Sequence, residues 1–432
     1  MNDQVKFIAT GDLFMTRRLP KDKYEGFEKI RECILRHDVR FSNLEMTFHD
    51  REGYPAAESG GTWAMMESRA LDDVLEFGFN LYATANNHSG DYGAEGVLAN
   101  IRHLRERDMI FSGTGENLSE ASKACYLETK NARIALISAC STFHAADVAG
   151  EQTSEMIGRP GLNPLRFKTR FHVEEEYYQM LQKLSKVTGI NDWSEFLIRN
   201  GYKTPLPSGT LSFGGAGEFV LDTTTWKETI PDQKDLKRIT DEIKEAKRQA
   251  DVVLVSMHSH ESLGADPSVS SMFMEYFSHA CIDAGANVIM GHGPHELRGI
   301  ELYKDGVIFY SLGNFLFETE TVSVQPADAF GAMGLSPNTK IGEYMNLRSK
   351  NGTVGYAVQN HIWNSIMAGW TMKNDKIKEI HLYPIDLGMR LKRSQKGVPK
   401  MGEEDILSYL NELCKPYGTK IEIRNGIGTI VL

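Results

Sequence analysis

The chain has 432 residues, of which 41% are hydrophobic and 25% are charged, and this composition is typical of a globular protein with a large core. Its formal net charge of -10 argues against a nucleic-acid surface, because phosphate backbones require clustered Lys and Arg, which the sequence lacks. Five scattered cysteines without a C-x-x-C spacing indicate reduced thiols rather than a disulfide framework or a zinc knuckle.

The sequence also predicts a location in the cell. No apolar run approaches the ~20 residues needed to cross a bilayer. The amino terminus, Met1 to Lys6, contains no apolar leader segment. We therefore expect a cytoplasmic protein with no membrane partner.

Strand-like apolar runs alternate with helical patterns through residue 140, as in a layered α/β domain. The predicted elements are strands at 5–10, 39–42, 81–85 and 133–139 and helices at 66–77 and 94–107. In the second helix Val97, Ile101 and Leu104 recur at i, i+4 and i+7, which places them on one face.

Residues 145–232 interrupt this alternation. They contain a Gly- and Pro-rich stretch at 158–164, a charged helix near 173–186 and a Gly-rich turn at 213–217. We interpret the interruption as an inserted cap over a pocket, because long insertions in enzymes tend to be functional. A surface appendage far from the chemistry is the alternative.

The α/β pattern then resumes with helices at 234–249 and 268–284 and strands at 252–257 and 287–290. One helix between successive strands favours parallel crossovers. A hairpin at 299–310, a strand pair around 365–382, a helix near 403–414 and short strands to 432 complete the chain. The predicted domain organisation is 1–144 and 233–320 as the two halves of one domain, 145–232 as the cap and 321–432 as the completion of the core.

Five of the apolar runs end in side chains that can hold a metal ion. In chain order these ends carry Asp12, Glu45, Asn87 with His88, His258, and His292 with His295. In an open α/β sheet, ligands bind outside the carboxyl ends of the strands. The sequence therefore predicts one shared pocket at these strand ends.

The residue types favour a transition metal. Gly293 and Pro294 prevent a helix, so His292 and His295 project from a constrained loop and could reach two different ions. Carboxylates add hard oxygen ligands, and mixed N/O ligation suits Mn, Fe or Zn better than Ca or Mg. The alternatives are that Asp12 caps a turn, that Glu45 is a solvated acid and that each His is an ordinary hydrogen-bonded residue.

These motifs resemble those of the CapA (poly-γ-glutamate synthesis) proteins, a branch of the calcineurin-like metallophosphoesterase superfamily. The motifs are Thr10-Gly11-Asp12, Asn43-Leu44-Glu45, Ala85 to Gly93, Val255 to His258, Gly291 to His295 and Tyr310 to Phe317. The resemblance implies a four-layer α/β/β/α sandwich with an inserted cap.

The resemblance also implies a site for one or two ions. Its ligands would be Asp12 and His295 for one ion, Asn87, His258 and His292 for the other, and Glu45 as the bridge. His88 would act as an acid or a charge-stabilising imidazole, with Asp91 orienting it. Asn314 and Glu261 would line the pocket.

Two departures from the family pattern affect this site. The superfamily's Asp-x-His opening appears as Asp12-Leu13-Phe14, so the first ion lacks one imidazole and a mononuclear site stays an alternative. After His258 stand Ser259 and His260 in place of an aromatic residue and Gly. His260 is therefore an added ligand, an acid/base residue or a hydrogen-bonded His.

The leading hypothesis is a metal-dependent hydrolase of a phosphoester or amide-type bond that acts on a small-molecule or peptide substrate. Arg159, Arg166 and Arg298 are candidates to hold an anionic group, with solvated surface arginines as the alternative. A metal-dependent peptide epimerase that abstracts an α-proton with His88, His144 or His260 is a second hypothesis. A non-enzymatic accessory protein of capsule polymer assembly is the third.

Overall fold

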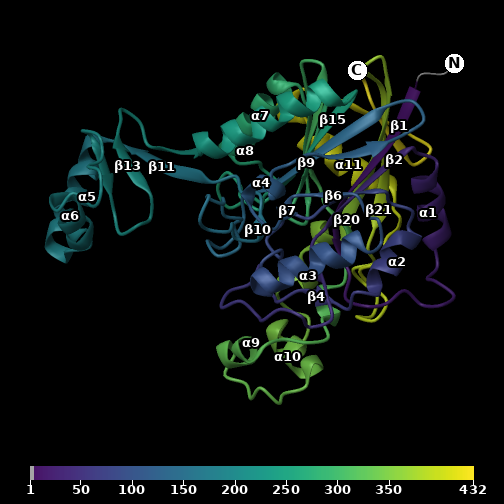
Figure 1. Cartoon of the computed structure of the whole chain (residues 1–432), viewed down its shortest axis with the longest axis horizontal. Helices are drawn as coiled ribbons and strands as arrows, with labels where there is room; N and C mark the ends of the chain where they lie inside the picture. Colours follow the sequence, from purple (N-terminus) through teal and green to yellow (C-terminus); the bar gives the residue numbers. More distant parts are fainter. Residues whose placement is uncertain (1–3) are drawn as a thin grey trace. The chain divides into compact units, whose positions relative to one another are not determined.

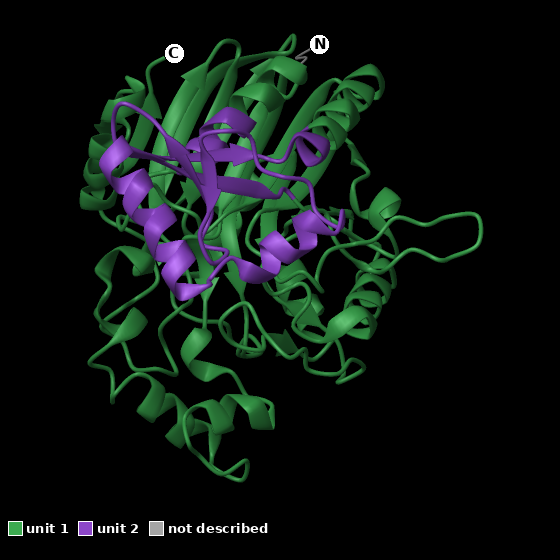
Figure 2. Ribbon diagram, turned by 90° about the vertical axis from the view of Figure 1, so that its left-hand side faces the viewer, with its two compact units in different colours: residues 1–164, 237–270, 278–432 green, residues 165–236, 271–277 purple. Residues whose placement is uncertain are grey.

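The computed structural model describes residues 4–432, and the expectation for the amino terminus rests partly on residues 1–3, outside this range. The chain forms two compact units: residues 1–164, 237–270 and 278–432, and residues 165–236 and 271–277 (Figure 2). Residues 145–164 belong to the larger unit. That the smaller unit covers a pocket stays a prediction. Within residues 4–432, no helix combines the length and apolarity needed to span a bilayer.

The first large sheet of the larger unit has ten strands and is built around β1. On one side β1 pairs in parallel with β2, which pairs in parallel with β5, and on the other side it pairs antiparallel with β20. Its strands are β1 (Gln4–Phe14), β2 (Val39–Leu44), β5 (Leu81–Ala83), β6 (Phe111–Ser112), β19 (Asn314–Phe317), β20 (Asn364–Lys373), β21 (Lys376–Asp386), β22 (Lys400–Met401), β23 (Ile421–Arg424) and β24 (Ile427–Ile430).

The second large sheet has six strands in the order β17-β18-β16-β15-β9-β8. The inner strands run parallel and each edge strand is antiparallel to its neighbour, so the predicted hairpin at 299–310 is confirmed at one edge. The strands are β8 (Cys125–Glu128), β9 (Arg133–Cys140), β15 (Val252–His258), β16 (Val288–His292), β17 (Leu297–Tyr303) and β18 (Gly306–Leu312).

The two sheets pack face to face. Strand β1 lies against β16 and β18, and one core cluster takes side chains from both sheets, among them Phe41 and Leu254. Phe7 on β1 stacks on Trp370 of β20 with ring centroids 5.1 Å apart. Strands buried on both faces need nearly continuous apolar sequences, which explains why these strands were recognisable from the sequence.

Helices cover the outer faces of the sheets. A second core cluster joins Phe27 of α1 and Leu71 of α2 to Ile8 of the first sheet. The crossover helices α7 and α8 bury Ile243 and Cys281 completely. The helices of the larger unit, including the two that continue into the smaller one, are α1 (Phe27–Leu35), α2 (Ala70–Glu76), α3 (Gly93–Arg105), α4 (Leu118–Ala121), α7 (Gln233–Gln249), α8 (Met272–Ala284), α9 (Ala327–Ala332), α10 (Ile341–Arg348) and α11 (Glu404–Leu413) (Figure 1). The result is the expected four-layer α/β/β/α sandwich.

Helix α3 confirms the prediction for 94–107, and Val97, Ile101 and Leu104 are buried as expected. The helix predicted at 66–77 is shorter, because Met65 and Met66 form strand β4, which pairs with β3 (Thr47–Phe48). Helix α1 was not predicted. Tertiary pairing overrode the local helical pattern at Met65–Met66.

The smaller unit has its own four-stranded sheet and two helices. Its elements are β11 (Phe167–Val173), α5 (Glu175–Thr188), α6 (Asp192–Arg199), β12 (Thr210–Ser212), β13 (Glu218–Leu221) and β14 (Trp226–Pro231). Phe167 of β11 stacks on Phe273 with centroids 4.3 Å apart, so the short segment 271–277 belongs to the core of this unit.

Replacing Gly11 by Ala tests how closely the first sheet is packed behind Asp12. A Cβ at Gly11 would lie 1.8 Å from the backbone oxygen of Gly313, the oxygen that accepts the hydrogen bond of the Asp12 amide. Since backbone cannot yield as a side chain can, Gly11→Ala should lower the free energy of unfolding by about 3 kcal/mol. Urea denaturation midpoints measure it. Gly342→Ala in α10, where no described atom lies within 4 Å of the new Cβ, is the control and should stabilise by about 0.5–1 kcal/mol. Equal midpoints for Gly11→Ala and the wild type would contradict the prediction.

Candidate metal centre

The predicted strand ends converge, and they come from both sheets. Asp12 lies on β1, Glu45 follows β2 and His88 lies in the turn after β5, all in the first sheet. His258 ends β15 and His292 ends β16 in the second sheet, where they are register partners. The five strand ends therefore meet where the two sheets of the sandwich face each other.

One group of candidate ligands surrounds Asp12. Its Oδ1 lies 3.4 Å from Nδ1 of His292 and 3.6 Å from Nδ1 of His258, and these two ring nitrogens are 2.9 Å apart. All three side chains are fully buried. Ring nitrogens this close either share a proton or face a common cation.

Further groups surround Glu45. Its Oε1 lies 3.7 Å from Nε2 of His258 and 3.7 Å from Nε2 of His295. Nε2 of His258 is also 3.1 Å from Nε2 of His260. The ligand atoms of three overlapping groups each lie within 4.8 Å of one another: Asp12 with His258 and His292, Glu45 with His258 and His260, and Asp12 with Glu45 and His295.

The chemistry of these donors fits a divalent cation. Both carboxylate oxygens of Glu45 are buried without a hydrogen-bond partner among residues 4–432. Burial, with the nearby charge of Asp12 as a second cause, raises the pKa of the Glu45 carboxyl well above its ordinary value. Burial also lowers the pKa of His258 and His260 well below the ordinary value and that of His292 to about 3. Neutral imidazoles and an uncompensated carboxylate are the donors that a transition metal requires.

Surrounding groups hold the candidate ligands in place. Asn43 Nδ2 donates to Asp12 Oδ1 at 2.7 Å, and the Gly293 amide donates to Asp12 Oδ2 at 3.0 Å. Ser256 Oγ lies 2.6 Å from Nε2 of His292. Such outer partners fix the orientation of a ligand and tune its basicity. From the sequence, Asn43 was named only as part of the Asn43-Leu44-Glu45 motif and was assigned no role. Its place at a strand end, two residues before Glu45, is the sequence feature that indicates a role beside the candidate ligands.

The loop that carries His292 and His295 is strained. His295 has a φ of +63°, which is uncommon for a residue with a side chain. Gly293 has a φ of +116°, and a Cβ there would lie 2.8 Å from the Ser259 amide nitrogen. Backbone strain of this kind clusters at functional sites, where packing maintains it. Asn314 Oδ1, 2.9 Å from Nδ1 of His295, helps to hold the ring.

The turn after β5 contains a His–Asp pair. Nδ1 of His88 lies 2.7 Å from Oδ2 of Asp91, which also accepts the amide of Ala64 at 2.7 Å. The ring of Phe14 packs edge-on against His88 with centroids 5.3 Å apart. Phe14, which stands at the position of the His in the Asp-x-His opening, is therefore a packing partner of His88.

Asn87 lies beside this pair. Its Nδ2 donates to the Gly60 carbonyl at 2.8 Å, while its Oδ1 is buried and has no partner in the described part of the chain. An orphaned amide oxygen is consistent with a ligand, and the role assigned to Asn87 stays a prediction.

The residues predicted to bind substrate have protein partners. Arg298 is 1% exposed and donates to the carbonyls of Pro267 and Glu261 at 2.8 and 2.9 Å, so it supports the loop after β15. The Glu261 carboxylate accepts from Ser141 Oγ at 2.6 Å. Their roles toward substrate stay predictions.

The other two predicted arginines lie in different units. Arg159 donates to the Val148 carbonyl at 2.8 Å in the larger unit. Arg166 pairs with Asp235 at 3.0 Å inside the smaller unit. Their roles toward substrate also stay predictions.

Two facing sheets flanked by helices, with a carboxylate–imidazole cluster at their strand ends, agree with the calcineurin-like metallophosphoesterase fold that the motifs imply. The chain belongs to the family described as bacterial capsule synthesis protein PGA_cap, which matches residues 6–319. The resemblance drawn from the motifs is confirmed.

Individual relatives differ in how much of the chain they match. The uncharacterized protein y4sH of Sinorhizobium fredii is 31% identical over 451 residues, covering 100% of this chain and 94% of that protein. The capsule biosynthesis protein CapA of Bacillus anthracis is 26% identical over 324 residues, covering 73% of this chain and 61% of that protein. A hypothetical protein from Thermus thermophilus, with a solved crystal structure, aligns at a TM-score of 0.41 and 12% identity over 88% of this chain and 99% of that one.

Glu45→Gln tests whether the cluster binds a cation. In chelator-treated protein the substitution should leave the melting temperature unchanged or raise it. It replaces an uncompensated buried carboxylate by a neutral carboxamide of nearly the same shape. Added Mn²⁺ should stabilise the wild type by about 2.7 kcal/mol at a hundredfold excess over Kd, and Glu45→Gln far less. Calorimetric melting with and without the ion measures both effects. Glu379→Gln, beside His381 on the exposed side of β21, is the control and should respond like the wild type. An identical Mn²⁺ response in Glu45→Gln would exclude Glu45 as a ligand.

Proposed function

We propose that the protein is a metal-dependent hydrolase of an amide-type or phosphoester bond. The observation that supports this most directly is the environment of Glu45. Its carboxylate is completely buried, has no hydrogen-bond partner within residues 4–432 and lies 3.7 Å from ring nitrogens of both His258 and His295. A buried charge of this kind is costly unless a cation or another partner compensates it.

The residues that would hold the cations are the members of the three overlapping groups, with Asn87 as a further ligand. They are Asp12, Glu45, Asn87, His258, His260, His292 and His295. In this set His260 is a ligand in addition to those that the motifs imply. A divalent transition metal in such a site supplies Lewis-acid polarisation of the scissile group and a water acidified toward neutral pH.

The chain's own acid/base group is the His88–Asp91 pair. The Asp91 carboxylate accepts amide protons from Gly60 and Ala64, so it is held as an acceptor. Nδ1 of His88 therefore carries the proton that it donates to Asp91. This leaves Nε2 of His88 as the ring atom that would take a proton from the attacking water and then pass it to the leaving group, a role that requires fixed orientation.

The names of the relatives guide the choice of substrate. The matching family and the Bacillus relative are named for capsule synthesis. We therefore propose an amide-linked, anionic peptide as the first substrate class to test, with phosphoesters as the second. The competing function is a role in capsule polymer assembly without catalysis. It predicts that the protein hydrolyses neither anionic peptides nor phosphoesters.

His292→Ala tests the proposed hydrolase. Removing this imidazole should cost metal and turnover together, because His292 lies next to Asp12 and His258. In the purified His292→Ala protein the metal content, measured by mass spectrometry, should fall to about background. Hydrolysis of a γ-glutamyl anilide and of a phosphodiester should fall to about background as well. His381→Ala, a partly exposed His on β21, is the matched control and should keep both. Full hydrolysis by a metal-free His292→Ala protein would refute the proposal.

The epimerase hypothesis keeps the same site and predicts a different isotope result. It is supported by the presence of two imidazoles outside the group around Asp12, the buried His88 and the half-buried His260. For a hydrolase, peptide incubated with the enzyme in deuterated water should be cleaved without deuterium at its α-carbons. Mass spectrometry and NMR of recovered peptide measure this. Deuterium at an α-carbon with an intact peptide bond would show epimerisation instead.

A further inference from the structure

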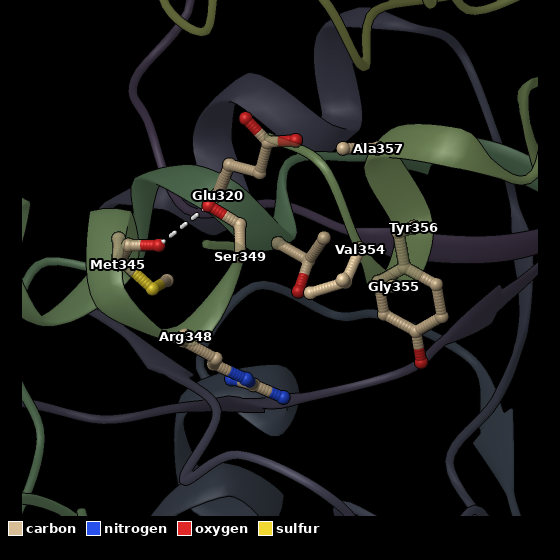
Figure 3. Close-up of a pocket in the computed structure, with 9 residues that line it drawn as sticks. Glu320, Met345, Arg348, Ser349, Val354, Gly355, Tyr356 and Ala357 are labelled. Atoms are coloured by element: carbon tan, nitrogen blue, oxygen red, sulfur yellow. Dashed lines mark hydrogen bonds between the residues drawn. The ribbon is translucent and has the colours of Figure 1, made fainter. Parts of the chain in front are cut away.

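A cavity of about 180 Å³ lies beside the metal centre, between η1 (Thr319–Thr321), α10 and η2 (Gly355–Val358) (Figure 3). Complete small-molecule sites occupy ~300–1,000 Å³. The cavity therefore has room for one group of a larger ligand rather than for a whole one.

One wall of the cavity touches the metal centre. Tyr356 lines the cavity, and its ring centroid lies 5.8 Å from that of His295. Both rings pack on Phe317, at 5.2 Å for Tyr356 and 4.7 Å for His295. A group bound against Tyr356 would thus be separated from the candidate ligand His295 by little more than the Tyr356 ring.

The other wall is tied to the same centre through a loop. Arg348, at the end of α10, donates from Nη2 to the Gly61 carbonyl at 2.9 Å. The preceding residue, Gly60, donates its amide to Asp91 and accepts from Asn87 through its carbonyl. The loop thereby fixes the Arg348 guanidinium relative to two residues of the metal centre.

The charge balance of the cavity favours an anion. Within residues 4–432 no carboxylate forms an ion pair with Arg348, whose hydrogen bond goes to a neutral carbonyl. The acidic residue of the lining, Glu320, is compensated by Lys396 at 2.5 Å and Arg393 at 3.4 Å. The guanidinium therefore retains donors and an uncompensated charge for a ligand.

The rest of the lining is largely apolar. Met345, Val354 and Ala357 line the cavity, and Figure 3 shows the side chains of Arg348 and Tyr356 extending from different sides of it, with Val354 between them. An aliphatic chain gains from contact with such a surface, whereas a bare inorganic anion does not. A guanidinium at one end matches a planar carboxylate through two parallel hydrogen bonds.

We propose that this cavity is a subsite for a carboxylate at the end of a short aliphatic chain of the substrate, with Arg348 as the residue that binds the carboxylate and Tyr356 as a positioning residue. The proposal rests on the proposed function and deepens it, because it names the group that the substrate places beside the metal centre. It also names an arginine different from the three that the sequence suggested.

The test uses glutarate, a five-carbon dicarboxylate, titrated calorimetrically into the full chain with and without Mn²⁺. Saturable binding is expected in both forms, since Arg348 does not depend on the ion. Arg348→Gln should weaken it by about 10- to 100-fold and Arg348→Lys by less, because lysine keeps the charge but loses the paired donors. Tyr356→Phe keeps the ring that lines the cavity and should bind as the wild type does, whereas Tyr356→Ala should weaken binding by about 3- to 10-fold. Arg424→Gln, an exposed arginine paired with Glu422 on the surface, is the control and should bind as the wild type does.

These measurements test the carboxylate subsite independently of metal binding. The absence of saturable glutarate binding, or equal binding by wild type and a folded Arg348→Gln, would overturn the proposal. Displacement of glutarate by equimolar inorganic phosphate or by neutral glutaramide would also overturn it, since neither combines a carboxylate with an aliphatic chain. Metal content should be unchanged in Arg348→Gln. If the wild type binds no metal yet binds glutarate through Arg348, the subsite stands and the proposed hydrolase fails.

Discussion

The negative charge buried at the facing ends of the two sheets is the constraint on which the site depends. Asp12 and Glu45 are fully buried, and the imidazoles around them are kept neutral because burial lowers their pKa values. Neutral rings cannot compensate two carboxylates, and no described residue gives Glu45 a hydrogen bond to do so. The free energy of unfolding of a typical domain is only ~5–15 kcal/mol, so the fold can tolerate this buried charge only if a cation or a shared proton offsets it.

Close packing of the two sheets brings the buried carboxylates and imidazoles together. Strands β1 and β16 lie in different sheets, yet close packing between the sheets brings Asp12 next to His292. The approach of Gly11 to Gly313 shows how little space separates adjoining segments there. The strained conformation of His295 has the same origin, since the packing around it maintains a backbone that the isolated loop would not adopt.

The candidate site extends beyond the candidate ligands to the groups that hold them. Asn43 and the Gly293 amide fix Asp12, Ser256 fixes His292, and Asp91 fixes His88. On one side the rings of His295, Phe317 and Tyr356 connect the cluster to the cavity at α10. The same buried contacts therefore orient the candidate ligands and connect them to the cavity.

The amino-acid sequence by itself determined the alternation of strands and helices, the family and most of the candidate ligands, because buried strands read as apolar runs and Gly293-Pro294 marks a fixed loop. Helix α3 was predictable from three apolar positions, whereas Met65–Met66 was not, since its pairing with β3 is long-range. Only the tertiary structure decided that two sheets supply the cluster, that Asn43 holds Asp12 and that Arg348 and Tyr356 border a cavity beside it. The physical reason is that these relations join residues far apart in the chain, and local sequence patterns carry no information on which distant surfaces will pack together.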